Sequence, residues 1–318
     1  MTKRNSAPSC CGANRNVTPK EAAPEFPIAD AQEQEAQRAE VIWLHGGRGH
    51  LGTDRPLLPQ DGEAPLRESQ VKPFGLERFA VTNRRFARFV AATHYRSDAE
   101  RYGWSYVFRG FLPMPHLHPA VPQTPWWHAV RGADWRHPFG PHSDIAALMD
   151  HPACHISHND ARAFAHWAGA RLPSEAEWEF AARAGQGDIR YTWGDEDPSE
   201  RLAFCNIWQG DFPRLNTGFD GYLATAPVAS FEPNPWGFYN MLGNVWEWCA
   251  ERFRVRSSSQ AARARDAAAR AEGEYLQKGG SYLCHASYCH RYRIAARTGR
   301  SADTSSCHSG FRLAWDPV

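Results

Sequence analysis

Residues 171–178 of this 318-residue chain read Arg-Leu-Pro-Ser-Glu-Ala-Glu-Trp. Ser174 followed three residues later by Glu177 predicts a helix start, because each side chain can accept a hydrogen bond from the other residue's backbone N–H. Trp178 and Ala182 then follow at helical spacing. We therefore expect this helix to begin at Ser174 and to bury one face.

The regions around this helix predict a mixture of helices and strands. Residues 41–44 form a short apolar run that stops before two glycines, as a strand does. Thr82 and Ser157 are expected to cap two further helices. From residue 191 onward, Gly, Pro, Asn and Trp recur every few positions, which predicts long loops. The chain is therefore expected to be an α+β protein with one loop-rich domain and little regular secondary structure.

Composition divides the chain and limits its partners. Residues 1–40 are polar and aperiodic, which predicts a disordered arm, and residues 41–318 are expected to form the domain, with 256–273 as a surface insertion. Lys plus Arg exceed Asp plus Glu by 36 − 35 = 1, so charge gives no case for nucleic acid or membrane as partner. We expect a monomer, with which a single domain of near-zero net charge is compatible.

Two cysteines lie in the segment that is densest in reactive groups. Cys284 and Cys289 stand five positions apart among cationic neighbours, which lower the pKa of a thiol and favour its thiolate form; these neighbours are His285, His290, Arg291 and Arg293. A structural thiol pair, a disulfide and a zinc site remain open, although zinc sites usually have further ligands. A bare pair of thiolates suits Cu(I) better than Zn²⁺.

Two further stretches are rich in oxygen ligands. Residues 206–222 and 235–248 combine Asn, Asp and Glu side chains with glycines that expose backbone carbonyls. A hard cation such as Ca²⁺ prefers such ligands. The same residues are also common in ordinary turns, so each stretch alone is a weak signal.

Several runs, in collinear order over residues 41–315, resemble formylglycine-generating enzymes. The resemblance rests on the Cys284/Cys289 segment and on the runs at 61–65, 125–127, 171–178, 206–210, 243–248 and 310–312. The runs at 171–178 and 243–248 mark the wider superfamily, whereas the cysteine pair is specific to catalytic members. The resemblance implies the formylglycine-generating enzyme fold, which is C-type-lectin-like.

The resemblance also implies an activity. Such enzymes use O₂ to convert the cysteine of a C-x-P-x-R motif in an unfolded sulfatase into Cα-formylglycine. By this resemblance Cys284 and Cys289 hold Cu(I), and the substrate cysteine adds a third sulfur ligand. Ser281 aligns with a serine that shapes the oxygen-side pocket. Substrate contacts are expected at Trp246, Tyr288, Arg297 and His308, the last standing where many members have Asn.

The resemblance further implies two calcium sites. The first set of ligands is Asn206, Ile207 (carbonyl), Asp220 and Tyr222 (carbonyl). The second set is Asn240, Gly243 (carbonyl), Val245 (carbonyl) and Glu247. Each set combines side-chain and backbone oxygens, as calcium sites commonly do.

The expected compartment follows from the cysteines. Secretory members carry two disulfides, and the matching positions here are Ala165 with Leu313 and Ala182 with Ile294. Loss of both partners of each bridge fits a reducing compartment, so we expect a cytoplasmic protein.

Two alternative functions remain open. One is an iron-dependent sulfoxide synthase, which needs a three-histidine site, usually from an added helical bundle. The other is a non-catalytic relative that binds a peptide or a sugar, which would not need the cysteine pair.

Overall fold

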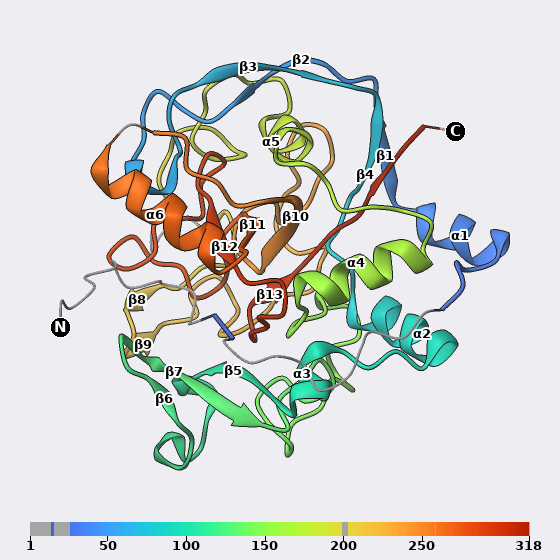
Figure 1. Cartoon of the computed structure of the whole chain (residues 1–318), viewed down its shortest axis with the longest axis vertical. Coiled ribbons are helices and arrows are strands. Elements are labelled where there is room, and N and C mark those ends of the chain that lie inside the picture. Colours follow the sequence, from blue (N-terminus) through green and yellow to red (C-terminus); the bar gives the residue numbers. More distant parts are fainter. Residues whose placement is uncertain (1–13, 16–25, 199–202, 258, 318) are drawn as a thin grey trace.

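A four-stranded sheet lies at the centre of the molecule (Figure 1). The computed structural model describes residues 14–15, 26–198, 203–257 and 259–317. The central strand order is β12-β11-β10-β13, with one parallel pair between β10 and β13. These strands are β10 (Trp246–Arg252), β11 (Tyr275–Lys278), β12 (Thr298–Arg300) and β13 (Ser309–Gly310).

Smaller sheets and short helices surround this sheet (Figure 1). Two three-stranded sheets have the orders β1-β4-β14 and β5-β7-β6, and β2-β3 and β8-β9 are separate antiparallel pairs. The strands are β1 (Val41–Leu44), β2 (Gly47–Leu51), β3 (Arg67–Val71), β4 (Phe74–Glu77), β5 (Trp104–Phe108), β6 (Ala120–Val121), β7 (Thr124–Arg131), β8 (Gly210–Asp211), β9 (Leu215–Asn216) and β14 (Ala314–Trp315). The α-helices are α1 (Ala31–Arg38), α2 (Asn83–Thr93), α3 (Asp98–Tyr102), α4 (His158–Trp167), α5 (Glu175–Arg183) and α6 (Gln260–Ala271), with 3₁₀ turns at Pro59–Asp61, Arg109–Phe111 and Pro115–Leu117.

The helix starts predicted from capping residues are confirmed. α5 begins after Ser174, whose side chain and that of Glu177 form the reciprocal capping box. Thr82 caps α2 and Ser157 caps α4 in the same local manner. These signals were readable because an N-cap involves residues only three positions apart.

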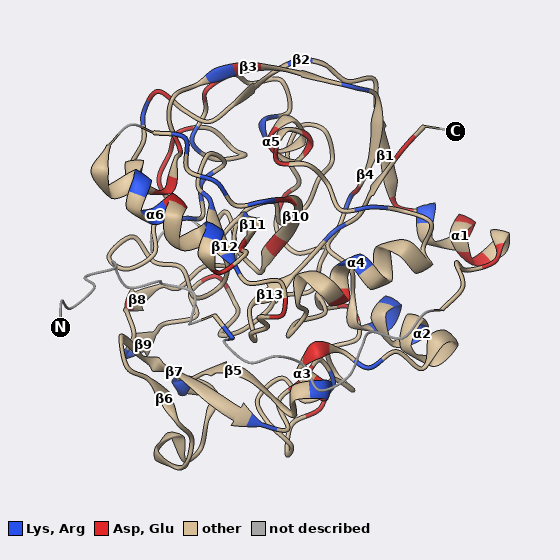
Figure 2. Cartoon of the chain, in the orientation of Figure 1, with Lys and Arg blue, Asp and Glu red and all other residues tan. Residues whose placement is uncertain are grey.

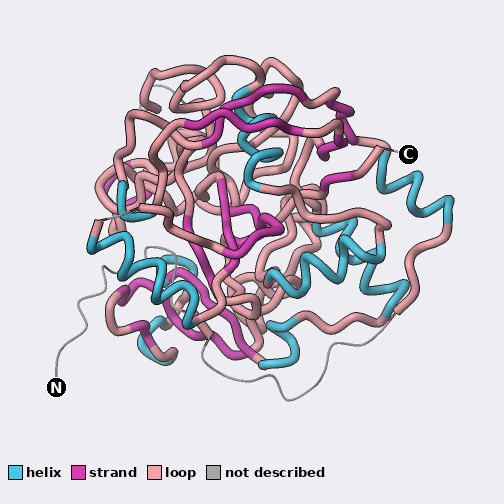
Figure 3. Tube along the Cα trace, turned by 45° about the horizontal axis from the view of Figure 1, so that its top comes forward, coloured by secondary structure: helices cyan, strands magenta, loops and turns pink. Residues whose placement is uncertain are grey.

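Loops make up most of the fold, as Figure 3 shows. Residues 132–157 and 217–245 run without a helix or a strand. Several clusters of buried side chains hold these loops, and the largest packs α5 against the central sheet. The prediction of a single loop-rich α+β domain is confirmed.

One buried ion pair joins three runs that are distant in sequence. The guanidinium of Arg312 donates to both carboxylate oxygens of Glu247, each at 2.7 Å. The indole of Trp178 donates to the same carboxylate at 2.8 Å. All three side chains are buried, so the charges have little access to water and depend on one another. α5, β10 and the C-terminal run are thereby fixed together.

The arm predicted over residues 1–40 extends too far. Residues 26–40 are part of the fold: α1 spans 31–38, and the ring of Phe26 packs edge-on against Phe89 at 5.4 Å. Gln37 of α1 is buried and accepts a hydrogen bond from Arg85. The polar composition concealed these contacts, because they join the segment to a helix about fifty residues away. The arm's Cys10 and Cys11 lie outside the described residues.

The segment predicted as a surface insertion, 256–273, contains α6. Most of this helix is exposed, while Ala262 and Ala269 are buried against the core. Figure 2 shows acidic and basic residues interspersed over the molecule. Within the described ranges, no helix is long and apolar enough to cross a membrane.

The buried ion pair gives the first prediction. Arg312→Ala leaves the Glu247 carboxylate buried without its cation, so it should lower the free energy of unfolding by about 3–5 kcal/mol. Urea denaturation measures this change. Arg214→Ala is the control, since that side chain is 82% exposed, and its effect should stay within about 0.5 kcal/mol. Equal effects of the two substitutions would contradict the role of the pair.

Candidate active site

Cys284 and Cys289 lie at the end of a tight turn that leaves the central sheet. Gly279 and Gly280 follow β11 with φ of +92° and +76°. A Cβ at Gly280 would lie 2.8 Å from the backbone of Tyr292, so only glycine permits this approach. The loop then closes on itself, because the Cys289 N–H donates to the His285 carbonyl at 2.7 Å. The close backbone approach brings the two thiols together.

The two sulfurs face each other at 3.1 Å. Neither sulfur is part of a disulfide, and Cys284 is 1% and Cys289 2% exposed. This separation is longer than the roughly 2.05 Å bond of a disulfide. Two soft ligands at this spacing are able to contact one soft metal ion.

Arg291 supplies a positive charge beside the pair. Its guanidinium lies 3.9 Å from the Cys289 sulfur and forms an ion pair with Asp61 at 2.6 Å. Burial, and next the charge of Arg293, lower the pKa of His290 to about 4. At neutral pH the imidazole of His290 is therefore uncharged, and Arg291 rather than His290 favours a thiolate at Cys289.

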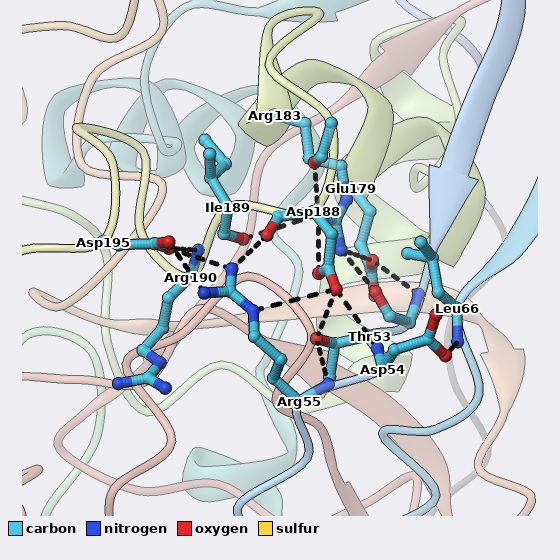
Figure 4. Close-up of polar contacts among 12 residues, drawn as sticks. Thr53, Asp54, Arg55, Leu66, Glu179, Arg183, Asp188, Ile189, Arg190 and Asp195 are labelled. Carbon is cyan, nitrogen blue, oxygen red and sulfur yellow. Dashed lines mark hydrogen bonds and ion pairs between the residues drawn. The ribbon is translucent and has the colours of Figure 1, made fainter.

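The segment that carries Asp61 is fixed by its own polar network. The backbone N–H of Thr53 donates to the Glu63 carbonyl, and the Glu63 carboxylate pairs with Arg293. Figure 4 shows how the preceding loop is anchored: Thr53 donates to Asp188, and Arg183 lies between Asp188 and Glu179. Asp61 and Glu63, which lie 230 residues earlier in the chain, thus hold the side chains of Arg291 and Arg293 in place.

Three predicted site residues belong to the region that holds the sulfurs. The Ser281 hydroxyl lies 4.0 Å from the Cys284 sulfur and is buried. Trp246 is buried in the same cluster as both cysteines, and Tyr288 packs against that cluster. The structure therefore places Ser281 beside Cys284, and it places Trp246 in, and Tyr288 against, the buried cluster that contains both thiols.

Arg297 makes its contacts elsewhere. Its guanidinium pairs with Glu175 at 2.8 Å and donates to the carbonyls of Gly62 and Arg254. We therefore assign Arg297 to the charge network that supports the fold. The predicted substrate contact at Arg297 has no support in this geometry.

His308 packs against an aromatic side chain behind the site. Its ring lies edge-on to Trp127, with centroids 4.7 Å apart. The backbone carbonyl of His308 accepts a hydrogen bond from the backbone N–H of Trp246 at 2.9 Å. His308 thus supports Trp246, and its side chain is buried.

Two aromatic residues at the site were missed by the sequence analysis. The Phe212 ring stacks on Tyr288 with centroids 4.2 Å apart and an angle of 7°. The indole of Trp126 donates to the Tyr288 hydroxyl at 3.0 Å. Trp126 belongs to the 125–127 run, but sequence alone gave no sign that it meets a residue 162 positions away.

The first predicted calcium set contains an unpaired buried oxygen. Asn206 Oδ1 is buried and accepts no hydrogen bond from the described residues. The nearby carboxylate of Asp220 accepts from the backbone N–H groups of Ile207 and Tyr222, and burial raises its pKa to about 6. A buried acceptor and a destabilised carboxylate fit a cation.

The second predicted calcium set shows the same feature at Asn240. Its Oδ1 is buried and lacks a hydrogen-bond donor within the described part of the chain. Its amide group donates to the carbonyls of Val228 and Ser230. Glu247 differs from Asp220, because Arg312 and Trp178 already bind its carboxylate. The fit to a cation therefore rests mainly on Asn240 here.

Backbone hydrogen bonds connect the first of these loops to the thiol pair. The Trp208 N–H donates to the Cys284 carbonyl at 3.0 Å. The Asn244 N–H donates to the Asn206 carbonyl at 2.8 Å, and the Asn244 carbonyl accepts from Tyr282. These hydrogen bonds attach the 206–208 loop to the segment that carries Cys284, so a well-ordered loop also restricts the position of that segment.

The geometry of the pair gives a second prediction. A mild oxidant such as diamide should join Cys284 to Cys289, because their sulfurs already lie at 3.1 Å. Peptide mapping by mass spectrometry should find this disulfide ahead of any that involves Cys249, which is also buried. Preferential oxidation of Cys249 would show that the two sulfurs do not face each other in solution.

Comparison with known proteins places the chain in a family. Residues 26–317 match the sulfatase-modifying factor enzyme 1-like domain. The chain is 48% identical to the formylglycine-generating enzyme of Thermomonospora curvata, over 92% of this chain and 99% of the relative. It is also 40% identical to the inactive Cα-formylglycine-generating enzyme 2 of Bos taurus, over 87% and 88% of the two chains.

The solved structure of PvdO from Pseudomonas aeruginosa shares the fold, with a TM-score of 0.60 at 22% identity over 87% of this chain and 94% of that one. The chain belongs to the sulfatase-modifying factor enzyme family, the family of the formylglycine-generating enzymes.

Proposed function

We propose that this protein is a copper-dependent oxidase that forms Cα-formylglycine from the cysteine of a C-x-P-x-R motif in an unfolded sulfatase. The observation that carries the proposal is the approach of two buried sulfurs, Cys284 and Cys289, to 3.1 Å without a disulfide between them. A relative named inactive is also 40% identical, so family membership alone does not decide activity. The thiol pair is the feature that favours a catalytic member.

The side chains around the pair suit a soft metal ion. Copper bound by Cys284 and Cys289 would supply a centre that takes a further thiolate and reduces O₂. The guanidinium of Arg291 offsets the negative charge of the thiolates. Ser281 is buried 4.0 Å from the Cys284 sulfur, and Trp246 is buried in the cluster that contains both cysteines; this burial keeps water from the reacting atoms.

The reaction balances when an external thiol supplies two electrons. The substrate cysteine loses two electrons and two protons as its Cβ–H and S–H bonds break, and the resulting thioaldehyde is hydrolysed to the aldehyde and H₂S. Reduction of O₂ to two waters takes four electrons, so two thiols of an external reductant provide the other two and become a disulfide. One water re-enters in the hydrolysis.

Other features bear on the alternatives and on the compartment. A sulfoxide synthase needs a three-histidine iron site, and the described residues contain no cluster of three or more His, Cys, Asp or Glu side chains placed to hold a metal. Ala165 and Leu313 are buried in one apolar cluster, and Ala182 and Ile294 in another. Apolar packing at these positions supports our proposal of a cytoplasmic protein.

We further propose that Ca²⁺ binds at Asn206 and Asp220 and at Asn240. The unpaired amide oxygens of Asn206 and Asn240 support this proposal. The bound ions would stabilise loops that contain few regular backbone hydrogen bonds.

The central prediction concerns turnover. A C-x-P-x-R peptide incubated with the protein, Cu(I), a thiol reductant and O₂ should gain an aldehyde and lose its sulfur, as measured by mass spectrometry. Cys284→Ser and Cys289→Ser should each reduce the rate at least about a hundredfold, because each removes one of two metal ligands.

A control substitution shows whether activity is lost because a metal ligand is removed or because any buried thiol is removed. Cys307→Ser removes a buried thiol outside the pair and should keep most of the activity. Full turnover by the Cys284 and Cys289 variants would overturn the copper assignment.

The calcium proposal predicts a pH-dependent stabilisation. Burial raises the pKa of Asp220 from its usual 3.8 to about 6, so without the ion the cost of the charged form grows as the pH rises between these values and is complete above about pH 6, and Ca²⁺ removes that cost. The rise in Tm on adding Ca²⁺ should therefore be larger at pH 7 than at pH 5, as differential scanning fluorimetry measures. In Asp220→Asn this pH dependence should disappear. A Tm unaffected by Ca²⁺ and by chelator at pH 7 would count against the sites.

A further inference from the structure

Arg15, near the N-terminus, is inserted into the folded domain. It is 3% exposed, although the flanking residues 1–13 and 16–25 lie outside the described part of the chain. Its guanidinium lies over two aromatic rings, at 4.3 Å from the centroid of Tyr102 and 4.4 Å from that of Trp104. Such contacts with aromatic faces are attractive for a cation.

Oxygen acceptors complete this site around Arg15. The guanidinium donates to the carbonyl of Trp104 at 2.6 Å, to that of Asp303 at 3.2 Å and to the Ser305 hydroxyl at 3.2 Å. The backbone N–H of Arg15 donates to the Thr304 hydroxyl at 2.9 Å. Two rings and three acceptors hold the flat guanidinium through its two terminal nitrogens, while its Nε is buried without an acceptor among the described residues; this planar arrangement suits arginine better than a lysine ammonium.

Asn14 is held beside it by backbone and side-chain contacts. The Ser301 N–H donates to the Asn14 side-chain oxygen at 2.9 Å, and the Asn14 amide group contacts Glu272 and Glu274. Two consecutive residues are therefore bound as a peptide is bound, through both main chain and side chains.

The sequence around Arg15 has the spacing of the proposed substrate. Residues 11–15 read Cys-Gly-Ala-Asn-Arg, with cysteine and arginine four positions apart as in C-x-P-x-R. Ala13 stands where that motif has proline. The chain thus carries a near-copy of the motif, and the arginine of this copy is the residue that is bound.

The Arg15 site adjoins the aromatic cluster that supports the candidate active site. Trp104 packs edge-on against Tyr106 at 5.0 Å, and Tyr106 is in one buried cluster with Trp208 and Leu283. Trp208 in turn donates its N–H to the Cys284 carbonyl. The Arg15 site is therefore linked to the thiol segment through packed aromatic side chains and one backbone hydrogen bond.

We propose that Arg15 is an intramolecular competitor of the substrate and fills the site that takes the arginine of C-x-P-x-R. This inference rests on the proposed function, because it takes its substrate motif from there. A sulfatase segment must displace Arg15 before its own arginine binds. The substrate's apparent affinity is reduced by the fraction of molecules in which the site is already filled.

The test measures binding without turnover. A fluorescein-labelled Ser-x-Pro-x-Arg peptide, in which Ser replaces the reactive cysteine, is titrated by anisotropy with the full-length protein and its Arg15→Ala variant. If Arg15 fills the site in about nine molecules of ten, the variant should bind the peptide about tenfold more tightly. Arg4→Ala is the matched control, since it removes the same charge from the same arm outside residues 11–15, and its affinity should equal that of the unchanged protein.

A second measurement separates competition from a purely structural role of Arg15. An unlabelled peptide of residues 8–18 with both cysteines replaced by serine should displace the labelled peptide from Arg15→Ala, and the same peptide with Arg15→Ala should not. Equal affinity of the unchanged protein and Arg15→Ala for the labelled peptide would overturn the inference and leave the proposed function intact. Binding by neither protein would overturn the proposed substrate, and the inference with it.

Discussion

The buried pair between Glu247 and Arg312 is the contact on which the rest of the structure depends. With Trp178 it joins α5, β10 and the C-terminal run. A carboxylate and a guanidinium removed from water are stable only when each is paired and hydrogen-bonded, so the three segments can adopt few other arrangements. β11, which pairs with β10, then delivers Gly279 and Gly280 to the turn before the thiols. A loop-rich chain thereby places two sulfurs at a fixed separation.

Ion pairs also fix the segments around the candidate active site. Arg291 pairs with Asp61 and Arg293 with Glu63, so the thiol segment is held by a loop from the other end of the chain. Arg297 belongs to this supporting network, through Glu175. The functional consequence is that Arg291 can remain close to the Cys289 sulfur while its own charge is balanced.

Sequence reasoning succeeded where the determining contacts are local. Ser174 and Glu177 lie three positions apart, and Cys284 and Cys289 lie five apart, so their geometry follows from short-range backbone structure. It failed for contacts between distant segments: Phe212 stacks on Tyr288 across 76 positions (288 − 212), and the pairing of Arg297 with Glu175 spans 122 positions. Neither composition nor periodicity encodes such pairings.

The proposed activity depends on two sulfurs holding one copper ion, and X-ray absorption at the copper edge tests this most directly. Protein loaded with one equivalent of Cu(I) should show a first shell of two sulfurs, which becomes three when a C-x-P-x-R peptide is added without O₂. Cys284→Ser should lose one sulfur from that shell. A first shell of nitrogen or oxygen, or a shell unchanged by the substitution, would contradict the account.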